Sequence, residues 1–226
     1  MRVHASLALP GVILAATAAA SPQNYPSTPS FTYRAGGEPF GITFFGEEAA
    51  WRGWVAEDGG RIRYSDDGDE WIQAVVAGSV RGQLRGIQFI DDSVGFCVGD
   101  GGALLKTTNG GLNWTLLDTI FEPVAAETAT LHQVYFHDED DGWVMGDDLV
   151  LYHTTDGGDN WVEVTPQTPH NADFYDIAFP DPANRDLFVV ARTDSSWGPS
   201  STPCVSQSRT TGDSGWVTIC TLRSST

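Results

Sequence analysis

The hydrophobic and polar positions of the chain follow a pattern that recurs four times. Each repeat opens with a short apolar segment, passes through a turn rich in acids or in Pro and Asn, and enters a second apolar segment. A third segment leads into a Gly-rich turn, and a fourth begins at a tryptophan. No segment shows the 3.6-residue period of an amphipathic helix, so the pattern predicts β-strands throughout.

The predicted strands form four sets of four. The first strands are 42–45, 87–90, 134–136 and 177–179, the second 54–55, 96–98, 143–145 and 187–191, the third 61–64, 103–107, 150–154 and 205–210, and the fourth 71–76, 114–117, 161–164 and 216–219. Four strands in a repeat of about 45 residues are typical of a β-propeller blade. The predicted fold is therefore all-β, a β-propeller with four recognisable blades at about 40–80, 84–122, 131–168 and 174–222, either a four-bladed ring or an incomplete or truncated seven-bladed type.

In the first three repeats the turn before the fourth strand carries an eight-residue box that ends in tryptophan. An Asp or Asn in its third position accepts backbone N–H groups, and a Gly in its fifth position adopts the left-handed backbone at low cost. The closing tryptophan returns a large apolar face to the sheet. The box residues are Tyr64, Asp66, Gly68 and Trp71, then Thr107, Asn109, Gly111 and Trp114, then Thr154, Asp156, Gly158 and Trp161. We assign them a structural role.

The first 39 residues precede the repeats. Arg2, an apolar run over 7–16 and the small residues at 18–20 predict a signal peptide over 1–20 that is cleaved near Ala20, and hence an exported protein. The run is too short to span a membrane. Residues 21–39 are rich in Pro, Ser, Thr and Gly and are interpreted as a linker or N-terminal arm, in which 31–34 has the alternation of one strand.

Charge narrows the possible partners. The chain has 12 Lys and Arg against 30 Asp and Glu, a net charge of −18, which disfavours nucleic acid and anionic membranes as partners. Five arginines lie close together in the sequence and form a candidate partner-binding group, with scattered solvated side chains as the alternative. They are Arg52, Arg61, Arg63, Arg81 and Arg85.

The fourth repeat departs from the pattern, with an insertion over 194–203 and an altered box over 208–216. Cys204 and Cys220 flank that box at equal distances from Gly212, so a disulfide across the hairpin is expected in an oxidising compartment. Cys97 stands between two apolar residues and is predicted to be a buried, inert thiol.

No Ser, His and Asp residues follow the order expected of a catalytic triad. The five histidines show no metal-ligand spacing, and the acids fall mostly in turns at equivalent places of each repeat. The turn 138–141 has four acids, but Gly142 stands where an EF-hand needs a ligand, so a charged turn is preferred to a calcium site. We expect no metal and no cofactor. Asn113 begins a glycosylation sequon, meaningful only in a eukaryotic secretory host.

The boxes YSDDGDEW, TTNGGLNW and TTDGGDNW resemble the Asp-boxes of bacterial neuraminidase repeats. The wider pattern of apolar strand, acidic turn, Gly-aromatic strand and box resembles the photosystem II stability and assembly factor family of β-propellers, over nearly all of residues 42–219. That resemblance implies a seven-bladed relative, a partner bound through an arginine-rich face, and a location in the thylakoid lumen or periplasm of a phototrophic host.

We therefore expect an exported, non-catalytic scaffold that binds a protein partner, with self-association if the propeller is incomplete. Two alternatives remain. The first is a fragment of a sialidase-like or xyloglucanase-like glycosidase, although the Arg-Ile-Pro motif of sialidases is missing from the sequence. The second is a carbohydrate-binding module. Hydrolysis assays and a glycan array separate these classes.

Overall fold

The computed structural model describes residues 3–6, 37–46, 51–80, 82–117, 129–164, 172–178, 187–193, 207–209 and 216–221, with the backbone alone for 3–6, 172, 178 and from 187 onward. These residues form strands, and the helices among them are two three-residue 3-10 turns, so none of the described helices has the length to cross a membrane. The chain divides into two compact units, Met1–Asp118 and Thr119–Thr226, which are described separately.

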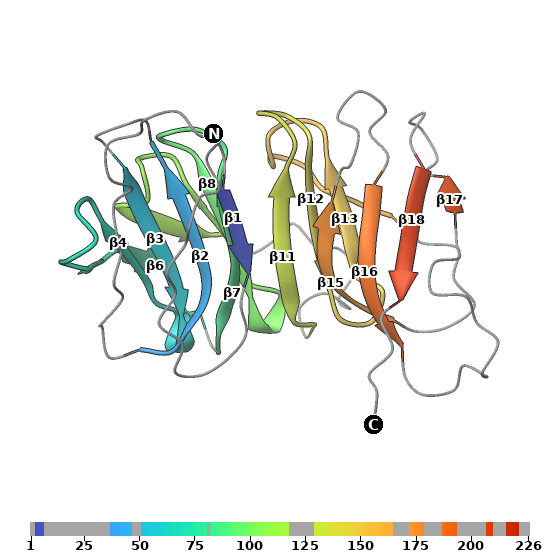
Figure 1. Ribbon diagram of the computed structural model, residues 1–226, viewed down its shortest axis with the longest axis horizontal. Helices are drawn as coiled ribbons and strands as arrows, with labels where there is room; N and C mark the ends of the chain where they lie inside the picture. The colour runs from blue at the N-terminus through green and yellow to red at the C-terminus, as the bar shows by residue number, and fades with distance from the viewer. Residues whose placement is uncertain are drawn as a thin grey trace, which may run out of the picture. The chain divides into compact units, whose positions relative to one another are not determined.

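Blade 1 belongs to the first unit and is an antiparallel sheet with its strands in chain order (Figure 1). Its strands are β2 (Pro39–Phe45), β3 (Arg52–Glu57), β4 (Ile62–Ser65) and β5 (Ile72–Gln73), with the 3-10 turn η1 (Asp58–Gly60) between β3 and β4. A further strand, β1 (Val3–Ser6), lies within the predicted signal peptide and pairs antiparallel with β2. Cleavage near Ala20 stays a prediction, and the predicted strand at 31–34 lies outside the described residues.

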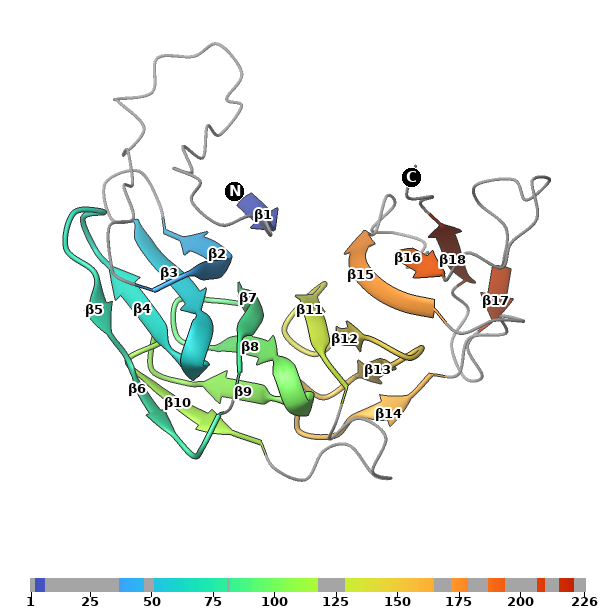
Figure 2. The same cartoon turned by 90° about the horizontal axis from the view of Figure 1, so that it is seen from below.

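Blade 2 completes the first unit. Its strands are β7 (Leu84–Phe89), β8 (Gly95–Gly99), β9 (Leu104–Thr107) and β10 (Asn113–Leu116), and the turn η2 (Asp100–Gly102) joins β8 to β9. The short strand β6 (Val75–Ala77) pairs in parallel with β10 at the edge of this sheet (Figure 2). All five residues of β8 are buried, as expected for a strand covered on both faces.

The single strand predicted over 71–76 is two strands that belong to different blades. β5 pairs with β4 in blade 1, whereas β6 pairs with β10 in blade 2. Ala74 lies between them, 4% exposed, with its N–H bonded to the carbonyl of Ile62. The N–H of the next residue, Val75, bonds instead to the carbonyl of Leu112 in blade 2. The apolar run therefore continues while the backbone changes partner, which an apolar pattern does not reveal.

The two blades of the first unit share one core. Trp54 of β3 stacks on Phe89 of β7 with ring centroids 3.8 Å apart, and Phe89 meets the edge of Trp114 at 5.7 Å. Trp54 and Trp114 are at most 1% exposed. Burying side chains of this size stabilises a domain by about 1.5–3 kcal/mol each, so these three rings join the two sheets.

Blade 3 opens the second unit and repeats the plan of blade 2. It consists of β11 (Leu131–Phe136), β12 (Gly142–Gly146), β13 (Leu151–Thr154) and β14 (Val162–Glu163) in chain order. β12, like β8, is buried at every position. Its core includes Met145 and Leu151, which pack with Phe174 and Ile177 of the next blade.

Blade 4 has a different strand order. Its strands are β15 (Ala172–Ala178), β16 (Leu187–Thr193), β17 (Gln207–Arg209) and β18 (Trp216–Thr221). β18 lies between β16 and β17 and runs parallel to β16, so the order expected from the other repeats is wrong here. The connection between residues 193 and 207 is longer than its counterparts in blades 1 to 3, and a long connection allows a strand to pair with a strand that is not its neighbour in sequence.

Candidate functional site

The box of blade 2 is a hairpin held by its own side chains. The Thr107 hydroxyl accepts the N–H of Gly111 at 3.1 Å and donates to the Asn109 amide oxygen at 3.0 Å. That oxygen also accepts the N–H of Asn113 at 3.0 Å. Gly111 has φ of +77°, and the Trp114 indole N–H donates to its carbonyl at 3.0 Å. Thr107, Asn109, Gly111 and Trp114 thus make a closed set of contacts.

The box of blade 3 makes the same contacts with a carboxylate in the third position. Thr154 accepts the N–H of Gly158 at 3.0 Å, and Trp161 donates to the Gly158 carbonyl at 3.2 Å. The Asp156 carboxylate accepts the side-chain amide of Asn160 at 2.7 Å and its backbone N–H at 2.8 Å. The Asn160 amide, its N–H and the Thr154 hydroxyl lower the pKa of Asp156 to about 2.

The box of blade 1 differs from its prediction by one residue. Tyr64 and Asp66 were expected in the first and third positions, but Ser65 and Asp67 make the corresponding contacts. The Ser65 hydroxyl accepts the N–H of Gly68 at 2.8 Å and donates to Asp67 at 3.1 Å. The N–H groups of residues 70 and 69 and the Ser65 hydroxyl lower the pKa of Asp67. Trp71 closes this box half-buried, whereas Trp114 is 0% exposed.

The reason for this shift is the length of the turn. From Ser65 to Trp71 there is one residue fewer than from Thr107 to Trp114. The sequence alignment on tryptophan therefore places Tyr64, an aromatic β-strand residue, where the hydroxyl belongs. In the structure Tyr64 lies opposite Trp54 in the β3–β4 pair, and its ring lies 5.5 Å from the Arg52 guanidinium.

One strand of blade 1 contacts the box of blade 2. The Trp54 indole N–H donates to the carbonyl of Gly110 at 3.2 Å, and the Arg52 guanidinium approaches the same oxygen at 3.4 Å. A Cβ on Gly111 would lie 2.2 Å from the Trp54 indole nitrogen, so this close approach requires glycine. The boxes therefore serve two purposes, closing their own hairpins and receiving the neighbouring blade.

The candidate arginine group is divided between two ends of the first unit. Arg52 begins β3 and forms an ion pair with Asp66, at the end that carries the boxes. Arg61 and Arg63 pair with Glu57, which is fully buried, at the end that carries η1 and η2. Arg85 lies at that same end. We call these two edges the box end and the 3-10 end.

Each described arginine of the group already has a carboxylate partner. Arg85 Nε donates to Asp100 at 2.8 Å, and its guanidinium lies 5.7 Å from the ring centroid of Phe40. Arg61 contacts Asp58 as well as Glu57. Arg81 lies outside the described residues. A partner that binds these guanidinium groups therefore has to share or replace their present acids.

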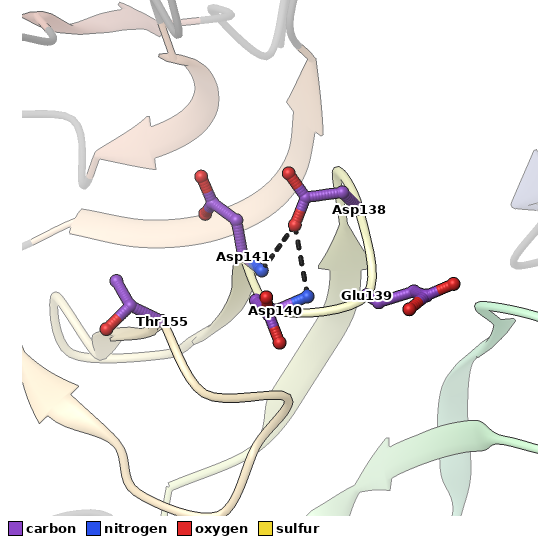
Figure 3. A pocket seen from close by; sticks show the side chains of 5 residues that line it. All are labelled: Asp138, Glu139, Asp140, Asp141 and Thr155. Carbon is purple, nitrogen blue, oxygen red and sulfur yellow. Dashed lines mark hydrogen bonds between the residues drawn. The ribbon is translucent and has the colours of Figure 1, made fainter.

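The acidic turn of blade 3 lines a hollow with Thr155 (Figure 3). The Asp138 carboxylate accepts the N–H groups of Asp140 at 3.0 Å and Asp141 at 2.8 Å, which makes it a turn-forming residue. Asp141 is 5% exposed and contacts His153 Nε2 at 2.8 Å. Among the described residues no group of three or more His, Cys, Asp or Glu side chains is arranged to hold a metal ion.

The cysteines and the sequon are only partly described. Cys97 is 0% exposed in β8, and burial raises the pKa of its thiol far above the ordinary value. Cys220 belongs to β18, but Cys204 lies outside the described residues, so the predicted disulfide stays a prediction. Asn113 is exposed at the start of β10.

Sequence reasoning missed a set of equivalent residues at the start of each blade. In β2, β7, β11 and β15 one residue bulges out of the register with the second strand. The bulged residues are Phe40, Arg85, His132 and Tyr175. The Phe40 and Arg85 side chains meet within the first unit, and the His132 and Tyr175 rings lie 4.4 Å apart within the second. Aligning the repeats on their first strands, rather than on the tryptophan, would have placed these residues in one column.

Four-stranded sheets closed by Asp-box hairpins define a β-propeller protein of the repeat type found in bacterial neuraminidases. A family model described as photosynthesis system II assembly factor YCF48 matches residues 69–188, just over half of the sequence. The chain belongs to this family.

Two solved structures are similar at low identity. One, described as YCF48 bound to D1 peptide, is 15% identical, with a TM-score of 0.46 over 85% of this chain and 60% of that one. The chain thus spans 60% of that protein's length. YCF48 from Cyanidioschyzon merolae is also 15% identical, with a TM-score of 0.38 over 71% of this chain and 69% of that one. Comparison with curated proteins gave no significant match.

Proposed function

We propose that the chain is a non-catalytic propeller scaffold that binds a protein partner during the assembly of photosystem II. The observation that carries this proposal is membership of the assembly-factor family over residues 69–188. The described box residues support it, because their hydroxyl, carboxylate and indole groups are engaged in holding turns and blades. The loops at the two ends of the blades are left as the surfaces for recognition.

We place the partner on the 3-10 end of the first unit. Arg61, Arg63 and Arg85 lie there with side chains 21–37% exposed, on an otherwise acidic protein. Guanidinium groups bind carboxylates in two-pronged geometry and remain charged at any physiological pH. A partner segment with acidic groups or a free C-terminal carboxylate fits this surface, in exchange for the intramolecular acids.

Fluorescence anisotropy with a labelled D1 peptide, the ligand named for one YCF48 structure, tests the partner and the surface together. We expect Arg61→Ala and Arg85→Ala each to weaken binding about tenfold, since a charge-assisted hydrogen bond contributes about 1.5–3 kcal/mol. Arg52→Ala at the box end is the matched control and is expected to retain the affinity. Equal losses in all three variants would contradict the assignment of this end, and no binding by the wild type would contradict the choice of peptide.

The scaffold proposal also has an enzymatic test. The purified protein is expected to release no product from sialosides or xyloglucan. Hydrolysis above the buffer blank would overturn the non-catalytic assignment and support the glycosidase alternative. A carbohydrate-binding role would appear as saturable binding on a glycan array without hydrolysis.

Export is part of the same proposal. Export is supported by the apolar run over 7–16, which is followed by small residues, and the signal peptide is expected to be cleaved near Ala20. N-terminal sequencing of the mature protein from its host tests the cleavage. Intact mass before and after reduction tests the Cys204–Cys220 bond, which requires an oxidising compartment. A mature protein that begins at Met1 would contradict export.

A further inference from the structure

Blades 2 and 3 place different basic side chains at the same two positions. The bulged residue of the first strand is Arg85 in blade 2 and His132 in blade 3. The residue opposite the aromatic of the second strand is Lys106 in blade 2 and His153 in blade 3, paired with Phe96 and Trp143. Both permanent cations of blade 2 are therefore replaced by histidines in blade 3.

The contacts in blade 2 involve charges that persist at all physiological pH values. Arg85 Nε lies 2.8 Å from Asp100, and its guanidinium lies over the ring of Phe40 in blade 1. The Lys106 ammonium lies 5.3 Å from the ring centroid of Phe96. Because Arg and Lys keep their protons well above pH 8, these contacts do not change between pH 5 and 8.

The contacts in blade 3 use the same two positions with partly different partners. His132, like Arg85, pairs with the Asp after the second strand, but its ring meets the following blade, whereas Arg85 meets the preceding one. His132 Nε2 lies 2.7 Å from Asp147 Oδ1, and its ring lies 4.4 Å from that of Tyr175 on β15. His153 Nε2 lies 2.8 Å from Asp141 Oδ1, and its ring stacks on Trp143 at 4.1 Å and 20°. A neutral imidazole makes a hydrogen bond in these places, whereas a protonated one makes an ion pair and a cation–π contact.

We propose that blade 3 is a proton-responsive counterpart of blade 2, in which acidification supplies the two cations that blade 2 carries permanently. Histidine is the side chain that changes charge between pH 5 and 8. Each ring has a carboxylate oxygen within hydrogen-bond distance and an aromatic ring beside it.

The remaining charged and titratable groups around the two histidines are predominantly acidic. Around His132 they are Asp147 and Asp148 in the turn after β12, with Asp173 and Tyr175 on β15. Around His153 they are Asp141 and the other acids of the turn 138–140, with Glu163 on β14 opposite the neighbouring Tyr152. Two further residues belong to these surroundings: Arg192 on β16 lies opposite Asp173 in the strand register, and the His137 N–H donates to the Asp141 carbonyl.

The consequence is a contact between blades 3 and 4 that strengthens on acidification. His132 joins Asp147 of blade 3 to Tyr175 of blade 4, and β11 packs against β15. Protonation adds charge attraction on one side of the ring and cation–π attraction on the other. β15 is therefore held more tightly at pH 5.5 than at pH 8.0, while the Phe40–Arg85 contact of the first unit stays constant.

Hydrogen exchange of the full chain measures this directly. We expect the amides of β15 to be protected about threefold more at pH 5.5 than at pH 8.0, after correction for intrinsic exchange rates, as for a partly exposed ion pair. The amides of β2 and β7 report the first unit and serve as the internal control, with no such difference.

Reciprocal substitutions sharpen the test. His132→Arg is expected to remove the pH difference and keep the high protection at pH 8.0, whereas His132→Gln keeps the low protection at both pH values. Arg85→His is expected to introduce a pH difference in β2. A wild-type β15 whose protection is the same at both pH values would overturn the proposal, as would a difference that persists in both His132 variants. Circular dichroism at each pH confirms that the variants are folded.

Discussion

Blades 2 and 3 share one backbone plan and differ in the side chains placed on it. In both, the box threonine accepts the N–H of a left-handed glycine, and the box tryptophan donates to the carbonyl of that glycine. The residues that differ between the two blades are those outside the threonine, the glycine and the tryptophan. The third box residue is Asn109 in blade 2 and Asp156 in blade 3, and both oxygens accept the N–H four residues later.

The difference teaches which parts of the repeat have a fixed chemistry. The hydroxyl and the indole satisfy the N–H and the carbonyl of the glycine, which the hairpin would otherwise leave unpaired, and the glycine itself adopts the left-handed backbone. The third position needs only a short side-chain oxygen, so either an amide or a carboxylate serves there. The charge of the third box residue is therefore free to differ between blades: Asn109 of blade 2 is neutral, whereas Asp156 of blade 3 is a carboxylate.

The largest expected effect comes from removing the box tryptophans. Trp114→Ala and Trp161→Ala should each lower the free energy of unfolding by about 3–5 kcal/mol, because both indoles are buried and each meets a phenylalanine edge. Urea denaturation followed by circular dichroism measures the loss. Trp71→Ala is the comparison variant and should cost less, because Trp71 is half-buried. A cost below about 1 kcal/mol for Trp161→Ala would show that the two boxes are not equivalent.

The box hydroxyls come next. Thr107→Val and Thr154→Val keep the shape of the side chain but leave a buried glycine N–H without its acceptor, at an expected cost of about 1–3 kcal/mol. Thr108→Val and Thr155→Val, at the exposed neighbouring positions, are the matched controls and should stay within about 0.5 kcal/mol. Chemical denaturation of the four variants decides the point, and equal effects at 107 and 108 would contradict the assigned bond.

The same repeats show how far the sequence alone predicts this protein. Most strand positions in blades 1 to 3 follow from apolar runs separated by turns, because the second strands β3, β8 and β12 are almost wholly buried and the period is regular. The exception is 71–76, which contains two strands. The box of blade 1 was misplaced because its turn is shorter, and tryptophan spacing alone does not show where a residue is missing. Ser65 and Asp67 are recognised as the box residues only from the structure, in which the Gly68 N–H donates to the Ser65 hydroxyl.

The arginine group illustrates a different limit. Arg52 and Arg61 are nine positions apart in the sequence, yet they lie at opposite ends of one strand pair. Proximity in the sequence does not place these side chains on one surface, because the length of the extended strand β3 lies between them. Their carboxylate partners follow from strand register, which a single sequence does not specify.

Exchanging the residues of the turns between the second and third strands should change the stability by a smaller amount, with opposite signs in blades 2 and 3. Gly101 in η2 has φ of +66°, and the equivalent Asp148 of blade 3 has φ of +56° although it is not glycine. Gly101→Asp should therefore destabilise by about 1 kcal/mol, and Asp148→Gly should stabilise by about 0.5 kcal/mol, because a side chain in this region costs energy that glycine avoids. Thermal melts of both variants measure the exchange. Two shifts of the same sign would contradict the equivalence of the turns.

The smallest expected effect is a difference in acid sensitivity between the two boxes. The pKa of Asp156 is lowered to about 2, so its carboxylate contributes stability above the unfolded value of about 3.9 and loses it as the pH falls through about 2. Asp156→Asn should remove this dependence, and Asn109→Asp should introduce one in blade 2. Melting temperatures at pH 5.0 and 2.0 are the measurement, with differences of about 2 °C expected because the group is exposed. Since Asn109 already accepts the same backbone N–H without a charge, the Asp156→Asn protein should remain folded at pH 5.0. A wild type and an Asp156→Asn variant with the same acid response would show that the carboxylate contributes no more than the amide.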